Sequence, residues 1–288
     1  MGVNLSTLKG IRSYISSELK ELYTEKEIST LAGIIIKTVF RGIRLHQLYD
    51  PDHVVSKDQA SEITRICEEL KTGKPYQYVS GETAFCGCII RVGPAVLIPR
   101  PETEELANLI INENNDYKGK ITDFGTGSGC IAVALAANIP GALVTGIDIS
   151  EEALSISREN ALLNNVIVDF RKEDIFSFNH SLFMNTGIIV SNPPYVRDSE
   201  KKLMNRNVLD FEPHSALFVN DSDPIIYYRA LLDISEIILE KGGRLYFEIN
   251  EAMGESLAEL ISSRGYSEVE IIKDINEKDR IIKATKNG

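Results

Sequence analysis

The chain has 288 residues, of which 43% are hydrophobic and 25% charged, a composition typical of a globular protein with one or two domains. Its formal net charge of −11 argues against a surface that neutralises nucleic-acid phosphates. No stretch reaches the roughly 18 apolar residues of a membrane span, and the charged start of the chain lacks the apolar core of a secretion signal. We therefore expect a cytoplasmic protein that does not bind membranes.

The four cysteines and four histidines are scattered along the chain. Cys86 and Cys88 are separated by a single residue, which is not the spacing of a zinc or redox pair, and the histidines do not have the spacing of metal ligands. We expect reduced cysteines, structural or surface histidines, and no bound metal.

Residues 1–75 have the pattern of a small helical bundle. Thr24 with Glu27 and Ser56 with Gln59 have the spacing of helix capping boxes. Apolar residues spaced by three and four predict a further helix before these, and they are Leu5, Leu8, Ile11, Ile15, Leu19 and Leu22. Because nothing in this part suggests chemistry, we expect the bundle to dock a substrate or to form one wall of a site.

Residues 76–98 are expected to form a β-hairpin that links the bundle to the main domain, residues 99–288. Runs rich in β-branched and aromatic residues at 76–79, 85–92 and 95–98 are separated by glycines, which is the pattern of short strands joined by turns.

The sequence Pro-Arg-Pro-Glu-Thr-Glu occupies residues 99–104. Pro101 and the acidic residues after it suit the first turn of a helix. Arg100 lies in a rigid loop between two prolines, where it is either a surface residue or the partner of an anion or carboxylate.

Beyond residue 120, predicted strands and helices alternate. We expect helices at 131–137, 151–163, 224–240 and 253–263, and strands at 121–124, 143–147, 166–170, 188–191, 244–249, 269–273 and 280–284. Such alternation predicts a parallel, doubly wound α/β sheet. Residues 196–223 are long and irregular, which is typical of a mobile lid.

Residues 123–129, Asp-Phe-Gly-Thr-Gly-Ser-Gly, join a predicted strand to a helix. Glycine at every second position allows a tight turn and a close approach to a ligand, but it matches neither the dinucleotide fingerprint nor a P-loop. The turn fits a ligand with an amino-acid end, whose ammonium Asp123 would face. Asp148 is placed to accept two ribose hydroxyls, and Asp174 with Ile175 could hold an adenine ring.

Residues 191–195, Ser-Asn-Pro-Pro-Tyr, follow an apolar run that predicts a buried strand. The two prolines lack an N–H and end the pairing at the sheet edge where open α/β folds bind ligands. The Asn192 side chain and the Pro193 carbonyl offer two acceptors, and Tyr195 offers a flat ring. Together they could grip a planar NH2 group; the alternative is a turn that happens to contain two prolines.

These features resemble the S-adenosylmethionine-dependent methyltransferases of the Rossmann-like class, and Asn-Pro-Pro-Tyr resembles the motif of those that methylate planar nitrogens. Within that class, the chain resembles the release factor glutamine methyltransferase family over nearly its whole length. The most specific match is the Pro-Arg-Pro-Glu-Thr-Glu stretch. The other matching segments are 75–78, Gly81 with Phe85, 97–98, 123–127, 191–195, Glu212-Pro213 and Ala216-Leu217.

The resemblance implies a Rossmann-like seven-stranded sheet, preceded by the helical bundle and the hairpin. It implies transfer of a methyl group from S-adenosylmethionine to the side-chain amide nitrogen, N5, of the glutamine in the Gly-Gly-Gln motif of class-1 peptide chain release factors. The product is then S-adenosylhomocysteine, and we expect a monomer that does not bind nucleic acid directly.

The expected site residues fall into three groups. For the cofactor we expect contacts from Asp123, Phe124, Gly125, Thr126, Gly127, Asp148, Asp174, Ile175 and Asn192. For catalysis we expect Asn192, Pro193, Pro194 and Tyr195. For substrate binding we expect the same four residues together with Arg100 and Thr103.

At four positions the chain departs from the family pattern. Ile175 stands where an aromatic residue is common, and Pro224, Asn250 and Glu277 each stand where glycine is usual. These departures affect local loop shape and adenine packing more than the chemistry.

Three alternatives remain open. A ribosomal-protein glutamine methyltransferase would share the chemistry, and an adenine-N6 or cytosine-N4 methyltransferase could use the same Asn-Pro-Pro-Tyr motif on a flipped base. The third is a non-catalytic binding module with a degenerate cofactor site.

Overall fold

The computed structural model describes residues 5–288; the first four residues of the predicted bundle and the side chain of Leu45 lie outside the described part. The chain divides into two compact units. The N-terminal unit contains the residues up to Gly81 together with Arg206–Phe211, and the C-terminal unit contains Glu82–Asn205 and Glu212–Gly288.

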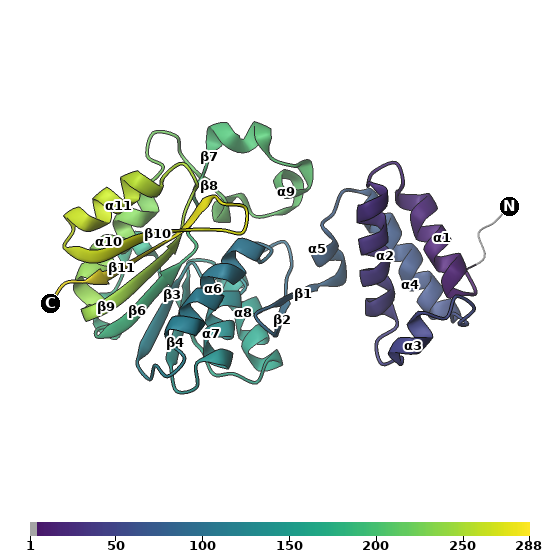
Figure 1. Cartoon of the computed structure of the whole chain (residues 1–288), viewed down its shortest axis with the longest axis horizontal. Helices are drawn as coiled ribbons and strands as arrows, with labels where there is room; N and C mark the ends of the chain where they lie inside the picture. The colour runs from purple at the N-terminus through teal and green to yellow at the C-terminus, as the bar shows by residue number, and fades with distance from the viewer. Residues whose placement is uncertain (1–4) are drawn as a thin grey trace. The chain divides into compact units, whose positions relative to one another are not determined.

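The N-terminal unit is helical, as the sequence predicts (Figure 1). Its helices are α1 (Leu8–Leu19), α2 (Glu25–Val39), α3 (Leu45–Leu48), α4 (Lys57–Lys71), α5 (Tyr76–Ser80) and α9 (Arg206–Phe211). Both predicted capping boxes are confirmed, at the starts of α2 and α4. The apolar stripe of α1 is buried from Leu8 to Leu19, but Leu22 lies beyond the end of the helix and is 56% exposed.

The predicted β-structure of residues 76–98 is only partly present. Strands β1 (Glu82–Phe85) and β2 (Cys88–Arg91) form an antiparallel hairpin. The expected strand at 76–79 is wrong, because these residues belong to α5, which starts after Pro75 and ends at Gly81 in the left-handed conformation. Residues 95–98 form turn and loop instead of a strand.

The core of the C-terminal unit is a seven-stranded sheet in the order β10-β11-β9-β6-β3-β4-β5, which confirms the predicted Rossmann-like α/β fold. The strands are β3 (Lys120–Phe124), β4 (Leu143–Asp148), β5 (Asp169–Lys172), β6 (Thr186–Ser191), β9 (Leu239–Glu248), β10 (Tyr266–Lys273) and β11 (Asp279–Lys286). The sheet is parallel except at β11, which runs antiparallel to both neighbours. Only five residues separate β10 from β11, which is too short for a parallel crossover.

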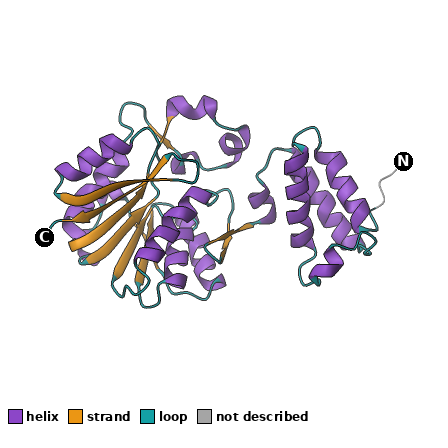
Figure 2. Ribbon diagram, in the orientation of Figure 1, coloured by secondary structure: helices purple, strands orange, loops and turns teal. Residues whose placement is uncertain are grey.

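Helices cover both faces of this sheet (Figure 2). One group contains α6 (Pro101–Glu113), α7 (Cys130–Asn138) and α8 (Glu151–Leu163), and the other contains α10 (Ile226–Ile238) and α11 (Gly254–Ser263). Every residue of β6 is buried, as expected for a central parallel strand covered on both sides. The strand order reverses between β3 and β6, so the loops after these two strands diverge at the same edge of the sheet.

Short elements occupy the segments between the main strands and helices. The 3-10 helices η1 (Ile175–Ser177) and η2 (His180–Leu182) follow β5. The predicted lid contains β7 (Val196–Arg197) paired with β8 (Phe218–Val219), the 3-10 helices η3 (Asp198–Leu203) and η4 (His214–Ala216), and α9. Among residues 5–288, no helix combines the length and apolar character of a membrane span.

Candidate active site

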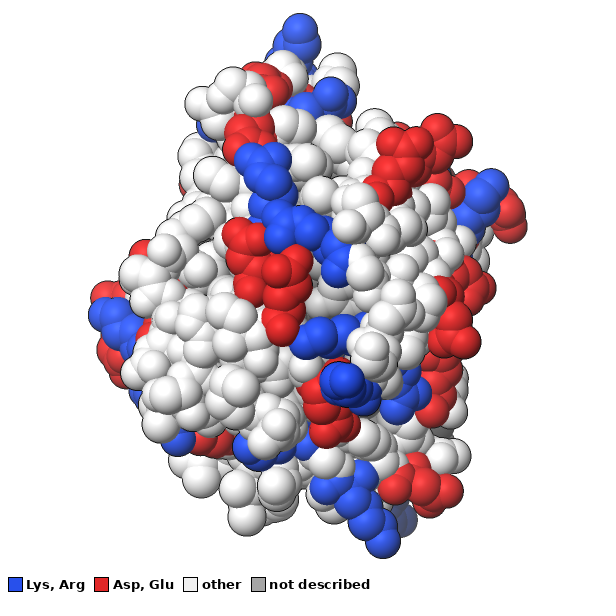
Figure 3. All heavy atoms as spheres, turned by 90° about the vertical axis from the view of Figure 1, so that its left-hand side faces the viewer, with Lys and Arg blue, Asp and Glu red and all other residues white. Residues whose placement is uncertain are grey.

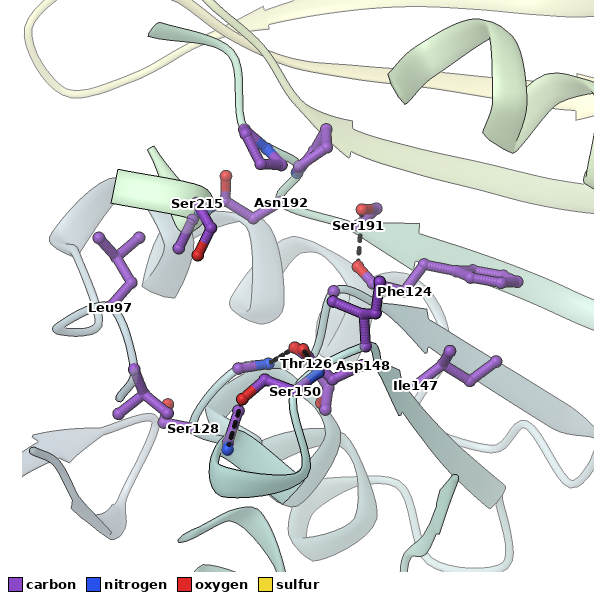
Figure 4. Close-up of a pocket in the computed structure, with 18 of the residues that line it drawn as sticks. Leu97, Phe124, Thr126, Ser128, Ile147, Asp148, Ser150, Ser191, Asn192 and Ser215 are labelled. Atoms are coloured by element: carbon purple, nitrogen blue, oxygen red, sulfur yellow. Dashed lines mark hydrogen bonds between the residues drawn. The ribbon is translucent and has the colours of Figure 1, made fainter. Parts of the chain in front are cut away.

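A cavity of about 410 Å³ lies at the carboxyl ends of β3, β4 and β6 in the C-terminal unit. This is the edge at which the strand order reverses, where open α/β sheets bind their ligands. Thr126, Asp148 and Ser150 lie toward one end of the cavity, and Asn192, Leu97 and Ser215 toward the other (Figure 4). The fold therefore brings the predicted glycine turn and the Asn-Pro-Pro-Tyr segment to one elongated site.

The glycine turn after β3 forms one wall of the cavity. Gly125, Gly127 and Gly129 have φ angles of 69°, 54° and 77°, a region that side chains with a Cβ rarely adopt. This conformation turns the Gly127 N–H toward Asp148, whose Oδ2 accepts it at 2.8 Å. Phe124, Gly125, Thr126 and Gly127 all line the cavity, as the sequence predicts.

Asp123 lies beneath the turn and has no exposed surface. Its Oδ2 accepts a hydrogen bond from the Thr126 hydroxyl at 2.6 Å, while its Oδ1 has no partner among the described residues. Burial raises the pKa of this carboxyl to about 7, and the nearby Asp148 contributes to the increase. Asp123 is not among the residues that line the cavity, and its bond to Thr126 shows that it supports the turn.

Asp148 ends β4 and lines the cavity. Its two oxygens accept backbone N–H groups, Oδ2 from Gly127 and Oδ1 from Ser150 at 2.9 Å (Figure 4). Burial raises the pKa of Asp148, and the two N–H donors oppose the increase. Each oxygen keeps a further lone pair, so the carboxylate can accept a pair of ligand hydroxyls.

Asp174 and Ile175 line the cavity next to the start of η1. The Asp174 Oδ1 accepts the Phe176 N–H at 2.9 Å, which orients the carboxylate. The rings of Phe176 and Tyr227 lie 5.5 Å apart and also line the cavity. Sequence reasoning missed both rings; they supply aromatic surface beside a position where the chain has isoleucine.

Asn192, Pro193 and Pro194 line the opposite end of the cavity. The Ser191 hydroxyl, at the end of β6, donates to the Phe124 carbonyl at 2.7 Å and ties this segment to the end of β3 (Figure 4). The Asn192 Nδ2 donates to the Thr103 hydroxyl oxygen at 3.0 Å. The Asn192 Oδ1 accepts no hydrogen bond from the described residues, so it is available to a ligand.

Tyr195 has a different environment from the other three residues of the motif. Its ring packs against the hydrophobic core and is not part of the cavity lining, and its hydroxyl donates to Glu248 Oε1 at 2.8 Å. Burial raises the pKa of Tyr195 well above its ordinary value, so the hydroxyl stays protonated. Its stacking on a substrate amide stays a prediction.

Thr103 connects the motif to a buried acid that sequence reasoning missed. Its hydroxyl donates to Glu248 Oε2 at 2.6 Å, and Glu248, at the end of β9, is 1% exposed. Burial raises the pKa of Glu248, while the hydrogen bonds from Thr103 and Tyr195 and the positive charge of Arg280 oppose the increase. In the sequence, Glu248 stands two residues before Asn250, which departs from the family pattern. This departure was the signal that could have drawn attention to Glu248.

Arg100 pairs with a carboxylate within the C-terminal unit. Its guanidinium donates to Glu212 Oε1 at 2.6 Å, and the buried Glu212 accepts the Ile98 N–H with its other oxygen at 3.1 Å. This pair joins the loop before α6 to a residue within the predicted lid. The structure gives Arg100 the role of an internal anchor, and its predicted contact with a substrate stays a prediction.

The departures from the family pattern have local structural consequences. The Asn250 amide nitrogen lies 3.4 Å from the Tyr195 carbonyl and 3.3 Å from Glu200 Oε2, so it links the motif to η3. Glu277 has a φ of 60°, in the left-handed region that favours glycine. Pro224 precedes α10, where its missing N–H interrupts no helical hydrogen bond.

Comparisons with known proteins agree with this geometry. The model of the Methyltransferase small domain family matches residues 103–210. The release factor glutamine methyltransferase of Bacteroides thetaiotaomicron is 43% identical over 276 residues, which is 96% of this chain and 99% of that protein. The enzyme of the same name from Flavobacterium psychrophilum is 41% identical over 280 residues, which is 96% and 98% of the two chains.

Solved structures agree in fold. The crystal structure of a methyltransferase from Pyrococcus furiosus aligns with a TM-score of 0.52 at 18% identity and covers 81% of this chain and 100% of that chain. At this low identity the likeness concerns the arrangement of helices and strands.

Proposed function

The chain belongs to the release factor glutamine methyltransferase family, and from this premise we propose that it transfers a methyl group from S-adenosylmethionine to N5 of the glutamine in the Gly-Gly-Gln motif of a peptide chain release factor. The observation that carries the proposal is the amide of Asn192, whose nitrogen is held by Thr103 while its oxygen is left available at the cavity.

The cavity residues fit S-adenosylmethionine. Asp148 would accept the ribose hydroxyls, because both of its oxygens are fixed by backbone N–H groups and keep a lone pair each. Asp174 would accept the adenine amino group with the oxygen that does not bind Phe176, and Ile175, Phe176 and Tyr227 would pack on the ring. The glycine turn would lie along the amino-acid end. When bound, this cofactor supplies a methyl group activated by a sulfonium.

The other end of the cavity would hold the acceptor amide. An amide nitrogen is a poor nucleophile because its lone pair is delocalised into the carbonyl. The Asn192 Oδ1 and the Pro193 carbonyl would accept its two N–H groups and so orient the nitrogen. Positive charge that develops on the nitrogen would strengthen both hydrogen bonds in the transition state. The carboxylates that line the cavity are Asp148, at the end of β4, and Glu173 and Asp174, which follow β5. These strands bear the cofactor end of the cavity and not Asn192, so the displaced amide proton would pass to solvent.

A release factor, and not a nucleic acid, suits the charge of the protein. The chain carries 42 acidic and 31 basic residues. On the side of the C-terminal unit that faces the viewer in Figure 3, acidic and basic side chains are interspersed around uncharged surface, without a broad basic field. The described helices of the N-terminal unit contribute no residue to the lining of the cavity. This unit would instead dock the partner protein.

The test is the variant Asn192→Ala, assayed with labelled S-adenosylmethionine and a purified class-1 release factor. We expect turnover to fall at least about 100-fold, because one acceptor of the oriented amide is lost, with cofactor affinity changed less than about threefold. The exposed Asn287→Ala is the matched control.

Near-normal turnover of Asn192→Ala would refute the proposed role of this residue. Ribosomal proteins and DNA are offered in parallel reactions, and label on either of these in place of the release factor would refute the proposed acceptor.

A further inference from the structure

Three side chains from distant parts of the chain form a hydrogen-bonded series that ends at the cavity. Asn192 follows β6, Thr103 lies in the first turn of α6, and Glu248 ends β9. The Asn192 Nδ2 lies 3.0 Å from Thr103 Oγ1, which lies 2.6 Å from Glu248 Oε2. Thr103 is 3% exposed and Glu248 is 1% exposed, so water does not compete for these bonds.

The direction of each hydrogen bond in the series is determined by the number of available protons. The two Glu248 oxygens face the hydroxyls of Thr103 and Tyr195, at 2.6 and 2.8 Å, and the positive charge of Arg280 favours the carboxylate form. A threonine hydroxyl has one proton, and a distance of 2.6 Å is typical of an O–H group that donates to a carboxylate. Toward Asn192, the Thr103 oxygen can therefore only accept.

This constraint selects one of the two orientations of the Asn192 amide. Its NH2 group must face Thr103, which leaves the Oδ1 for the cavity. The opposite orientation would place the Asn192 carbonyl oxygen against the Thr103 oxygen, which can only accept, and the NH2 group against the N–H donors of a substrate amide. The two ends of an asparagine side chain have nearly the same shape, so packing alone does not distinguish them.

We infer that Glu248 is a positioning residue, which acts through the Thr103 hydroxyl to hold the oxygen of Asn192 toward the acceptor amide. The consequence for turnover rests on the proposed function, whereas the orientation of the Asn192 amide does not depend on which acceptor is methylated. Thr103 also lines the cavity, and its predicted contact with a substrate stays a prediction.

The kinetic test compares Thr103→Val, which replaces the hydroxyl by a methyl group of similar size, with Thr103→Ser, which keeps the hydroxyl. With labelled cofactor and a class-1 release factor, we expect kcat of Thr103→Val to fall about 10- to 100-fold, because the Asn192 side-chain amide is no longer held in one orientation. KM and cofactor affinity should change less than about threefold, and Thr103→Ser should recover most of kcat. Thr122→Val, a buried threonine on β3 outside this series, is the control and should keep wild-type kcat.

A second measurement requires no acceptor. In protein labelled with 15N-asparagine, the side-chain NH2 protons of Asn192 should exchange slowly with solvent in the wild type and in Thr103→Ser, and at least about tenfold faster in Thr103→Val. Thr103→Ala replaces Thr103→Val if the latter does not fold.

The outcomes separate the two proposals. Equal exchange rates in all variants, or a Thr103→Val enzyme with wild-type kcat, would overturn the positioning role. A wild-type enzyme that shows slow exchange but does not label the release factor would refute the proposed acceptor and leave the positioning role supported.

Discussion

The Asp148 carboxylate offers a direct test of how the cofactor is held. We consider Asp148→Asn, which keeps the size of the side chain but replaces one acceptor oxygen by an NH2 group. In the wild type the two oxygens already accept the N–H groups of Gly127 at 2.8 Å and of Ser150 at 2.9 Å, so the replacement places the new NH2 group against one of these donors. At least one charge-assisted hydrogen bond to a ribose hydroxyl is then lost.

The expected magnitude follows from the strength of such bonds. A hydrogen bond to a charged group contributes roughly 1.5–3 kcal/mol, which corresponds to an increase in Kd of about 10- to 150-fold. The assay is titration calorimetry with S-adenosylmethionine and with S-adenosylhomocysteine. The matched control is Asp169→Asn, which removes the charge of a carboxylate on the neighbouring strand that is 53% exposed and pairs with Arg171.

The result that would refute this reasoning is a folded Asp148→Asn protein whose Kd for both ligands stays within about twofold of the wild-type value. An equal weakening by Asp169→Asn would show that the effect comes from the general loss of negative charge and not from the contact itself.

Two further predictions concern stability. Burial raises the pKa of Asp123 to about 7, so the native protein keeps a proton that the unfolded chain releases near pH 4. The free energy of unfolding should therefore fall as pH rises from about 4 to 7, by up to about 1.4 kcal/mol per pH unit. Asp123→Asn should remove this pH dependence of the free energy of unfolding. Urea unfolding curves of both proteins at several pH values provide the measurement, and the same pH dependence in both would contradict the prediction. Glu277 has a φ of 60°, so Glu277→Gly should relieve left-handed strain and stabilise the protein by about 1 kcal/mol in thermal unfolding. The control Glu270→Gly, within β10, should destabilise the protein. A loss of stability in both variants would contradict the strain argument.

Local patterns predicted the elements of this protein well where short-range physics decides them. The capping boxes at Thr24 and Ser56 begin α2 and α4 as expected, because the bonds they make lie within one helical turn. The helix α8 has the predicted bounds, Glu151–Leu163. Where local signals compete, prediction failed: the aromatic residues of 76–79 favour a strand, but Pro75 and Gly81 bracket a short helix.

The site was partly predictable for a related reason. The Asn-Pro-Pro-Tyr segment and the glycine turn each follow a buried strand, and parallel strands bring their carboxyl ends to one edge of the sheet. The motif could not reveal that Tyr195 turns away toward Glu248, nor that Arg100 is paired with Glu212. These orientations depend on partners that lie 53 and 112 residues away.

The sequence by itself determined the alternation of strands and helices, the two chemical ends of the site and the family, because each is encoded in contiguous residues. Only the tertiary structure decided which side chains support them. Thr103 lies 89 residues from Asn192 and 145 from Glu248, and the three meet because the first turn of α6, the loop after β6 and the end of β9 converge at one edge of the sheet. The burial of Asp123 was likewise decided by packing across the sheet, which no local pattern of residues specifies.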